Sequence, residues 1–323
     1  MTDLANRTNI EGVVRSALER ADITDIHTHL YAPEFGGLLL WGIDEMLTFH
    51  YIVAEFFRVA GHEIDYDRFW SLSKAQQADL IWDRLFVRRS PISEACRGVV
   101  TCLQSLGLDS RDRDLSGHRR YFAQVDSAKH LDRVLEISGV RRIVMTNDPF
   151  DELERPVWMS GTRFDERFKA ALRIDALLVD WRRVAPILRG MGYSVEPDLS
   201  GRTFDQVRRF LEDWIRRMRP VYMAASLGTT FHYPDDSPAA RFLEACVIPA
   251  AAEHNLPFAM MIGVRRQVNP NLRLAGDAVG RADLTAVVNL CSAYPKNRFL
   301  LTVLSREDPV SYTHLTLPTI YSV

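Results

Sequence analysis

The sequence predicts a parallel α/β fold of about six strands, with a large helical segment inserted after the first strand. Three observations support this prediction. Short apolar segments typical of buried strands alternate with amphipathic helical segments over the second half of the chain. Residues 31–123 contain no segment with the alternation of a strand. Hydrophobic residues make up 47% and charged residues 25% of the 323 positions, enough for a sizeable core.

The predicted elements follow in chain order. Ile10, Val13, Val14 and Leu18 recur at helical spacing and predict an N-terminal helix. Alternation at every second residue then predicts the first strand over 23–30. In the insertion, apolar residues recur at helical spacing in 46–59 and 69–84. The remaining strands are predicted at 142–146, 169–175, 220–227, 257–264 and 298–304.

We therefore divide the chain into four parts. Residues 1–30 hold the N-terminal helix and first strand, 31–123 the helical insertion, and 124–308 the other strands with their helices. Residues 309–323 contain no Asp, Glu, Lys or Arg and do not continue this pattern. We expect 309–323 to be a non-native tail.

Charge and cysteine content exclude several classes of partner and location. With 40 basic and 42 acidic residues, the net charge of −2 offers no general attraction for nucleic acid or a membrane surface. The four cysteines form no CxxC pair, which is typical of a reducing compartment. The N-terminus has no apolar signal-peptide core, and the longest apolar run is about half of a membrane span. We expect a cytoplasmic protein with a small-molecule partner, and a homo-oligomer remains open.

His27-Thr28-His29 is the strongest local signal for chemistry. Residues i and i+2 of a strand point to the same face, so both imidazoles can bind one ion. Asp25 lies two residues earlier on that face. The alternative is that both histidines are polar residues at the rim of the sheet. Their pairing at the end of the first strand favours a metal site.

Several motifs resemble those of known enzymes. Asp25-Ile26-His27-Thr28-His29-Leu30 resembles the first-strand signature of the amidohydrolase superfamily. Four further segments are similar to uronate isomerases, and the resemblance covers roughly 22–308. These segments are His50-Tyr51, Thr146-Asn147-Asp148-Pro149-Phe150-Asp151, Ala171-Leu172-Arg173-Ile174-Asp175 and Met261-Ile262-Gly263-Val264-Arg265. The resemblance implies a TIM-type (β/α)8 barrel, of which this chain contains about six strands.

The sequence also departs from that family. Ala225-Ser226-Leu227 stands where the family has Ser-Asp-His on its fourth strand, and Met261 stands in place of a fifth-strand histidine. The loss of these two histidines implies a divergent branch that binds one divalent metal, expected to be zinc.

The resemblance implies a metal-dependent aldose–ketose isomerase of hexuronates or related sugar acids. His27 and His29 are the expected metal ligands. The family's proton carrier is an Asp on the eighth strand, so no catalytic residue is assigned here. The expected substrate-binding residues are His50, Tyr51, Arg58, Arg173 and Arg265.

Two other functions remain open. One is a metal-dependent hydrolase of the same superfamily. The other is an inactive, truncated fragment, and we expect the full-length protein to continue past Asp308 and this chain alone to be inactive.

Four of the residues singled out have simpler explanations. Arg173 binds either a substrate carboxylate or a neighbouring carboxylate, from Asp148 or Asp175. Asp148 precedes Pro149 and is favoured as a turn residue. His50 and Tyr51 lie in an amphipathic stretch and could equally be packing residues.

Overall fold

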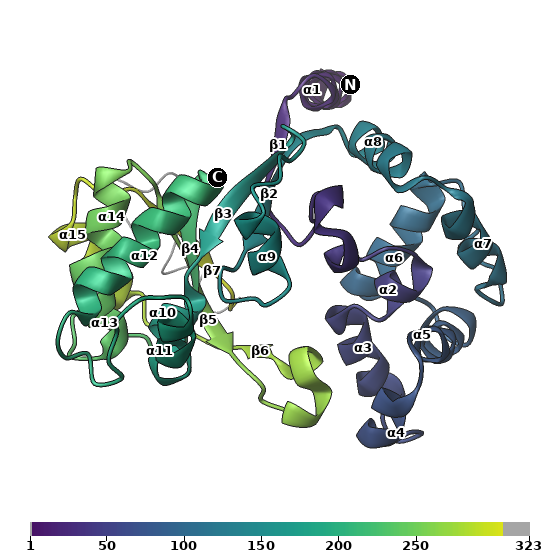
Figure 1. Cartoon of the computed structure of the whole chain (residues 1–323). Helices are drawn as coiled ribbons and strands as arrows, with labels where there is room; N and C mark the ends of the chain where they lie inside the picture. Colours follow the sequence, from purple (N-terminus) through teal and green to yellow (C-terminus); the bar gives the residue numbers. More distant parts are fainter. Residues whose placement is uncertain (1, 306–323) are drawn as a thin grey trace.

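The computed structural model describes residues 2–305, and the side chains of 9–305 (Figure 1). Within this range a seven-stranded sheet runs in the order β1-β2-β3-β4-β5-β6, and β7 pairs with β5. Six strands are parallel, and the two-residue strand β6 is antiparallel to β5. The strands are β1 (Ile23–Thr28), β2 (Val140–Asn147), β3 (Phe168–Arg173), β4 (Tyr222–Gly228), β5 (Phe258–Arg265), β6 (Ala278–Val279) and β7 (Phe299–Val303).

The predicted fold class is confirmed: the six parallel strands correspond to the six predicted segments. Two details differ. The third strand ends at Arg173, and Asp175 begins helix α10 (Asp175–Val179) instead of extending the strand. Strand β6 was not predicted because two residues are too few to show alternation. The predicted non-native tail lies outside the described residues.

The sheet is curled as part of a barrel. The Tyr222 hydroxyl on β4 donates a hydrogen bond of 2.5 Å to the Ile26 carbonyl on β1. In a flat sheet these strands, three places apart, would be separated by about 14 Å. A tyrosine side chain spans that gap only if the sheet bends inwards, and Tyr222 packs with Val144 and Ala171 on the inner face.

Two irregularities of register lie toward the carboxyl ends of the strands. Between Asp25 and Thr28, β1 has one residue more than β2 between paired positions. The pairing of β4 with β5 shifts at Gly228, opposite Gly263. Gly263 has φ +107°, and a Cβ there would lie 2.7 Å from the Gly280 carbonyl oxygen. Such bulges redirect side chains at the end of a sheet where active sites form.

Helices cover the outer face of the sheet and form the main core with it. Helix α8 shows how their ends are set: Asp126 accepts a hydrogen bond from the Lys129 amide, and Gly139 ends the helix with φ +68°. The outer helices are α8 (Ser127–Ser138), α9 (Glu154–Met159), α10, α11 (Trp181–Gly190), α12 (Thr203–Met218), α13 (Pro238–Phe242), η3 (Leu243–Val247), α14 (Ile248–Glu253) and α15 (Thr285–Ala293).

The segment between β1 and α8 is helical and has a core of its own, centred on Phe56, Phe69 and Trp82. It contacts the loop after β5: Trp70 Nε1 donates to the Asn271 carbonyl at 2.8 Å, and Asn269 Nδ2 donates to the Tyr66 hydroxyl at 3.0 Å. Its elements are η1 (Pro33–Leu38), α2 (Ile43–Leu47), α3 (His50–Ala60), α4 (Tyr66–Ser71), α5 (Lys74–Trp82), η2 (Asp83–Val87), α6 (Glu94–Ser105) and α7 (Ser116–Gln124); η4 (Pro270–Gly276) lies in the loop that they contact.

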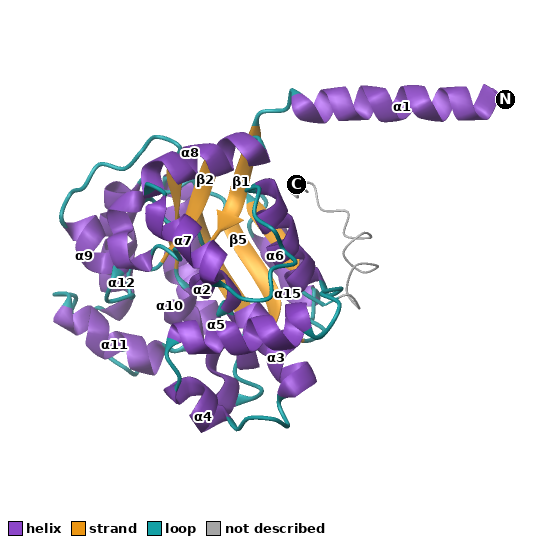
Figure 2. Ribbon diagram, turned by 90° about the vertical axis from the view of Figure 1, so that its right-hand side faces the viewer, coloured by secondary structure: helices purple, strands orange, loops and turns teal. Residues whose placement is uncertain are grey.

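The N-terminal helix α1 (Thr2–Glu19) extends away from the rest of the chain (Figure 2). The apolar residues that predicted it, including Ile10 and Leu18, are exposed. No helix among residues 2–305 is long and apolar enough to cross a membrane.

Candidate active site

His27 and His29 lie together at the carboxyl end of β1. Their ring centroids are 5.6 Å apart, with ring planes at 87°. Two Zn–N bonds of about 2.1 Å can join imidazoles whose centroids are up to roughly 6 Å apart. Asp25 Oδ1 accepts a hydrogen bond of 3.1 Å from the His27 amide and so holds the bulged end of the strand. The spacing expected from the sequence therefore brings both rings within reach of one ion.

Thr146, at the end of β2, orients the ring of His29. Its hydroxyl donates to the Thr28 carbonyl at 3.0 Å, and its oxygen lies 3.4 Å from His29 Nδ1. Because the hydroxyl proton is engaged by Thr28, the oxygen can accept from Nδ1–H. That arrangement leaves the lone pair of His29 Nε2 available to a metal, as in sites where an outer hydrogen bond selects the tautomer.

Both histidines are held in the neutral form that binds metals. Burial, as the largest cause, and the charges of the nearby His27, Arg173 and His50 together lower the pKa of His29 to about 4. Burial and the charge of Arg173 also lower the pKa of His27. Part of each ring is still accessible to solvent. At neutral pH the two imidazoles present lone pairs and no positive charge.

Arg173, the last residue of β3, is paired with Asp175. Nε and Nη2 donate to the two carboxylate oxygens, each at 3.1 Å. Asp175 also accepts from the Ser226 amide at 2.9 Å and from Arg266 Nη2 at 3.3 Å. Of the two carboxylates considered from the sequence, Asp175 is therefore the partner. Arg173 Nη1 makes no hydrogen bond within the described part of the chain.

The charges of this pair stabilise each other. Burial alone would lower the pKa of Arg173, but the charge and hydrogen bonds of Asp175 raise it. Burial alone would raise the pKa of Asp175, yet Arg173 and the Ser226 amide lower it. Both groups are therefore ionised, and the side chain of Arg173 keeps 27% of its surface exposed. The arrangement can present one edge of an oriented guanidinium to an anion.

The other predicted substrate-binding residues lie less close to His27, His29 and Arg173. His50 begins α3, and the rings of its neighbours Phe49 and Tyr51 are tilted against its imidazole with centroids 4.3 and 4.1 Å away. Burial lowers the pKa of His50, and the charge of His50 in turn acts on His29. Tyr51 is 61% exposed.

Arg58 and Arg265 are both exposed. Arg58 lies two turns further along α3, with its guanidinium 4.0 Å from Glu55. Arg265 ends β5 with its aliphatic chain over Gly280. Its neighbour Arg266 reaches Asp175 instead. The structure thus brings Arg266 into the cluster, a residue that the sequence analysis did not identify.

Asp148 has a local structural role. Its Oδ1 accepts from the Phe150 amide at 2.8 Å, which forms the turn after β2 as the sequence favoured. Burial raises the pKa of Asp148.

Glu154 is a buried carboxylate that sequence reasoning missed. It is 3% exposed and accepts hydrogen bonds from the Tyr31 hydroxyl (2.7 Å), Asn147 Nδ2 (2.9 Å) and the Asp148 amide (3.1 Å). Burial raises its pKa to about 7. No local pattern signals this role, because Glu154 lies among charged residues that suggest a solvated helix start.

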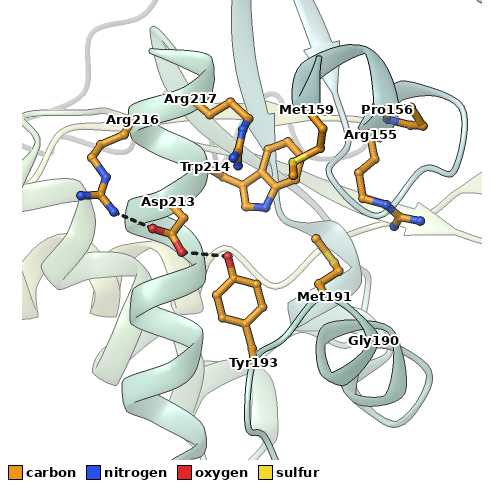
Figure 3. A pocket seen from close by; sticks show the side chains of 10 residues that line it. All are labelled: Arg155, Pro156, Met159, Gly190, Met191, Tyr193, Asp213, Trp214, Arg216 and Arg217. Carbon is orange, nitrogen blue, oxygen red and sulfur yellow. Dashed lines mark hydrogen bonds and ion pairs between the residues drawn. The ribbon is translucent and has the colours of Figure 1, made fainter. Parts of the chain in front are cut away.

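One cavity lies beside a predicted residue, and a second lies on the outer helices. One of about 680 Å³ separates α8 from the helical segment and is lined by Leu30, Tyr31 and Tyr51 among mainly apolar residues. The other, about 740 Å³, lies on the outer helices around Trp214 (Figure 3). Neither is lined by His27, His29 or Arg173. These three residues form a separate cluster at the ends of the strands.

The donor set fits one metal ion through two ligands. Within residues 2–305, no group of three His, Cys, Asp or Glu side chains is arranged to hold a metal. His27 and His29 supply two neutral nitrogen ligands of the kind that zinc prefers.

Comparisons with known proteins bear on the family. No family model matches the chain, and no curated protein matches it. A crystal structure of a uronate isomerase from Bacillus halodurans C-125 is 47% identical, with a TM-score of 0.92 over 97% of this chain and 74% of that chain.

Two further structures are similar in fold alone. They are a uronate isomerase from Thermotoga maritima (15% identity, TM-score 0.58, 94% of this chain and 75% of that chain) and a glucuronate isomerase from Caulobacter crescentus (14%, 0.65, 94% and 73%). The 47% identity over 97% of this chain and 74% of the Bacillus halodurans chain shows that the chain belongs to the uronate isomerase family.

Proposed function

We propose that this protein is a metal-dependent aldose–ketose isomerase that acts on hexuronates or related sugar acids. The observation that carries the proposal is the pairing of His27 and His29 beside the oriented guanidinium of Arg173, in a chain 47% identical to a uronate isomerase. The isomerisation moves a proton between C1 and C2 of an open-chain sugar. Such an enzyme needs one group that recognises the acid and another that stabilises negative charge on the sugar oxygens.

The described residues divide these tasks. His27 and His29 would hold one divalent metal, which we propose is zinc and which would supply Lewis-acid stabilisation of an enediolate. Arg173 would bind the substrate carboxylate through Nη1, the nitrogen that Asp175 leaves unpaired. Asp175 keeps the guanidinium in one orientation.

The helical segment between β1 and α8 would also contribute to substrate binding. His50 lies within electrostatic reach of His29, and Tyr51 is accessible next to it. We propose that these two side chains contact sugar hydroxyls. We assign Arg58 and Arg265 to the outer part of the substrate path, because both are exposed.

We also place the enzyme in the cytoplasm. All four cysteines are free, and Cys96, Cys246 and Cys291 are buried. Free thiols in this number are typical of a reducing compartment.

The test compares isomerisation with hydrolysis. The zinc-loaded full-length protein is incubated in D₂O with a panel of hexuronates, and NMR follows the ketose product, deuterium at its C1 and deuterium at C2 of the recovered aldose. A parallel panel of amides and lactones tests the hydrolase alternative. We expect ketose formation from at least one hexuronate and no hydrolysis. Hydrolysis without isomerisation would show that the protein is a hydrolase of the same superfamily.

A further inference from the structure

Glu154 connects two loops that border the proposed metal site. Its Oε1 accepts from Tyr31, which lies in the loop after β1. Its Oε2 accepts from Asn147 and from the Asp148 amide, at the end of β2. One carboxylate thus joins the ends of two neighbouring strands through three hydrogen bonds.

Burial of the Glu154 carboxylate is unfavourable by itself, so its presence at this position needs another explanation. Glu154 is 3% exposed, its three hydrogen-bond donors in the described chain are all neutral, and the charge of Arg173 acts on it only through a longer-range interaction. A buried carboxylate without a cation is costly, and an apolar side chain would avoid that cost. What the carboxylate provides is directional hydrogen bonding, which holds three donors at fixed positions.

The segment that Glu154 holds contains a proposed metal ligand. His29 lies two residues before Tyr31 and is bound on its other side by Thr146, the residue before Asn147. Beyond Tyr31, the Ala32 amide donates to Met145 Sδ on β2 at 3.3 Å. The segment from Thr28 to Ala32 is therefore attached to the end of β2 before and after His29, and Glu154, through the Tyr31 hydroxyl, supplies one of the two later attachments.

We propose that Glu154 is a positioning residue of the active site, whose bonds to Tyr31, Asn147 and the Asp148 amide hold His29 in the orientation that binds metal. This inference rests on the proposed function only in taking His29 as a ligand. Residues behind a ligand commonly change metal affinity 10- to 100-fold when they are removed, by this kind of orientation.

The experiment compares three variants with a matched control. E154A removes every bond, Y31F removes one, and E154Q keeps the shape. In E154Q the amide oxygen can still accept from Asn147 and Asp148 while its NH₂ donates to the Tyr31 oxygen. The control is Y193F, because Tyr193 also donates to a carboxylate, Asp213, at 2.9 Å, but on the outer helices (Figure 3).

Two measurements are made on each protein. Hydrogen–deuterium exchange of residues 28–32 in the metal-free protein reports the position of the segment independently of any activity. Competition with a chromophoric chelator reports the zinc Kd. We expect E154A to exchange at least about fivefold faster in this segment and to bind zinc roughly 10- to 100-fold more weakly. Y31F should show a smaller change in the same direction, and E154Q and Y193F should resemble the parent.

The outcomes distinguish positioning of His29 by the hydrogen bonds of Glu154 from an effect of its negative charge. Unchanged exchange or unchanged zinc affinity in E154A would overturn the proposal, and so would losses in E154Q as large as those in E154A. If E154A does not fold, Y31F decides: parent-like exchange and zinc affinity in that variant would overturn the proposal. If the parent binds zinc but isomerises no sugar acid while E154A shows the expected changes, the proposed function fails and the positioning role stands.

Discussion

Arg173 and Asp175 are joined by two hydrogen bonds of equal length, 3.1 Å from Nε and 3.1 Å from Nη2, across the point where β3 ends and α10 begins. The pair uses one edge of the planar guanidinium and leaves the Nη1 edge available. In the proposed function, this pairing orients the guanidinium of Arg173 for recognition of an anion.

The first prediction tests this orientation. Arg173→Lys keeps the positive charge but loses the planar fork. We expect kcat/KM for the best sugar acid to fall about 10- to 100-fold, the effect of losing a charge-assisted hydrogen bond. Steady-state kinetics measure it, and a variant with unchanged kcat/KM would contradict recognition by Arg173.

The second prediction concerns Asp175 and stability. Asp175→Asn leaves the largely buried guanidinium without its charged partner, so the free energy of unfolding should fall by about 3 kcal/mol. The control is Asp180→Asn, because Asp180 pairs with Arg183 at the same 3.1 Å but both side chains are more than half exposed. That change should lower the free energy of unfolding by less than about 1 kcal/mol. Urea unfolding measures both, and equal losses would refute the special role of the Arg173 pair.

The third prediction concerns metal binding. His27→Ala and His29→Ala should each lower bound zinc to well below one ion per chain, because each removes one of the two proposed ligands. His232→Ala serves as control, since His232 is exposed and lies 3.4 Å from Asp283, away from the pair. Elemental analysis after dialysis gives the stoichiometry. The same metal content in all three variants and the parent would rule out this site.

The fourth prediction concerns pH. The pKa of Glu154 is about 7 in the folded protein and about 4.3 in the unfolded chain. Between these two pH values, Glu154 is therefore protonated to a greater extent in the folded state than in the unfolded state. Stability from this group is present below pH 4 and is lost as pH rises through 7. Glu154→Gln removes this dependence.

Urea unfolding of the parent and of E154Q at pH 5 and pH 8 tests the sign. The variant should gain up to about 3 kcal/mol relative to the parent as pH increases. A parallel pH dependence in both proteins would show that Glu154 is not held at a raised pKa.

The sequence by itself determined the strands and the paired histidines of this protein. Alternation over 23–30 predicts that His27 and His29 share one face at the end of the strand, and the structure places their ring centroids 5.6 Å apart, with His29 just beyond the last residue of β1. The six parallel strands were also predictable, because apolar periodicity is a local property of the chain.

Only the tertiary structure decided the partners of these residues. Asp148 and Asp175 were equal candidates for Arg173 until the end of β3 turned into α10 and placed Asp175 against the guanidinium. A register shift between β4 and β5 precedes the point where Arg266, not Arg265, reaches this pair. Glu154 meets Tyr31, 123 positions away, only because β1 and β2 are neighbours in the sheet. Such contacts depend on strand order, register and loop path, and the local periodicity of a sequence carries none of the three.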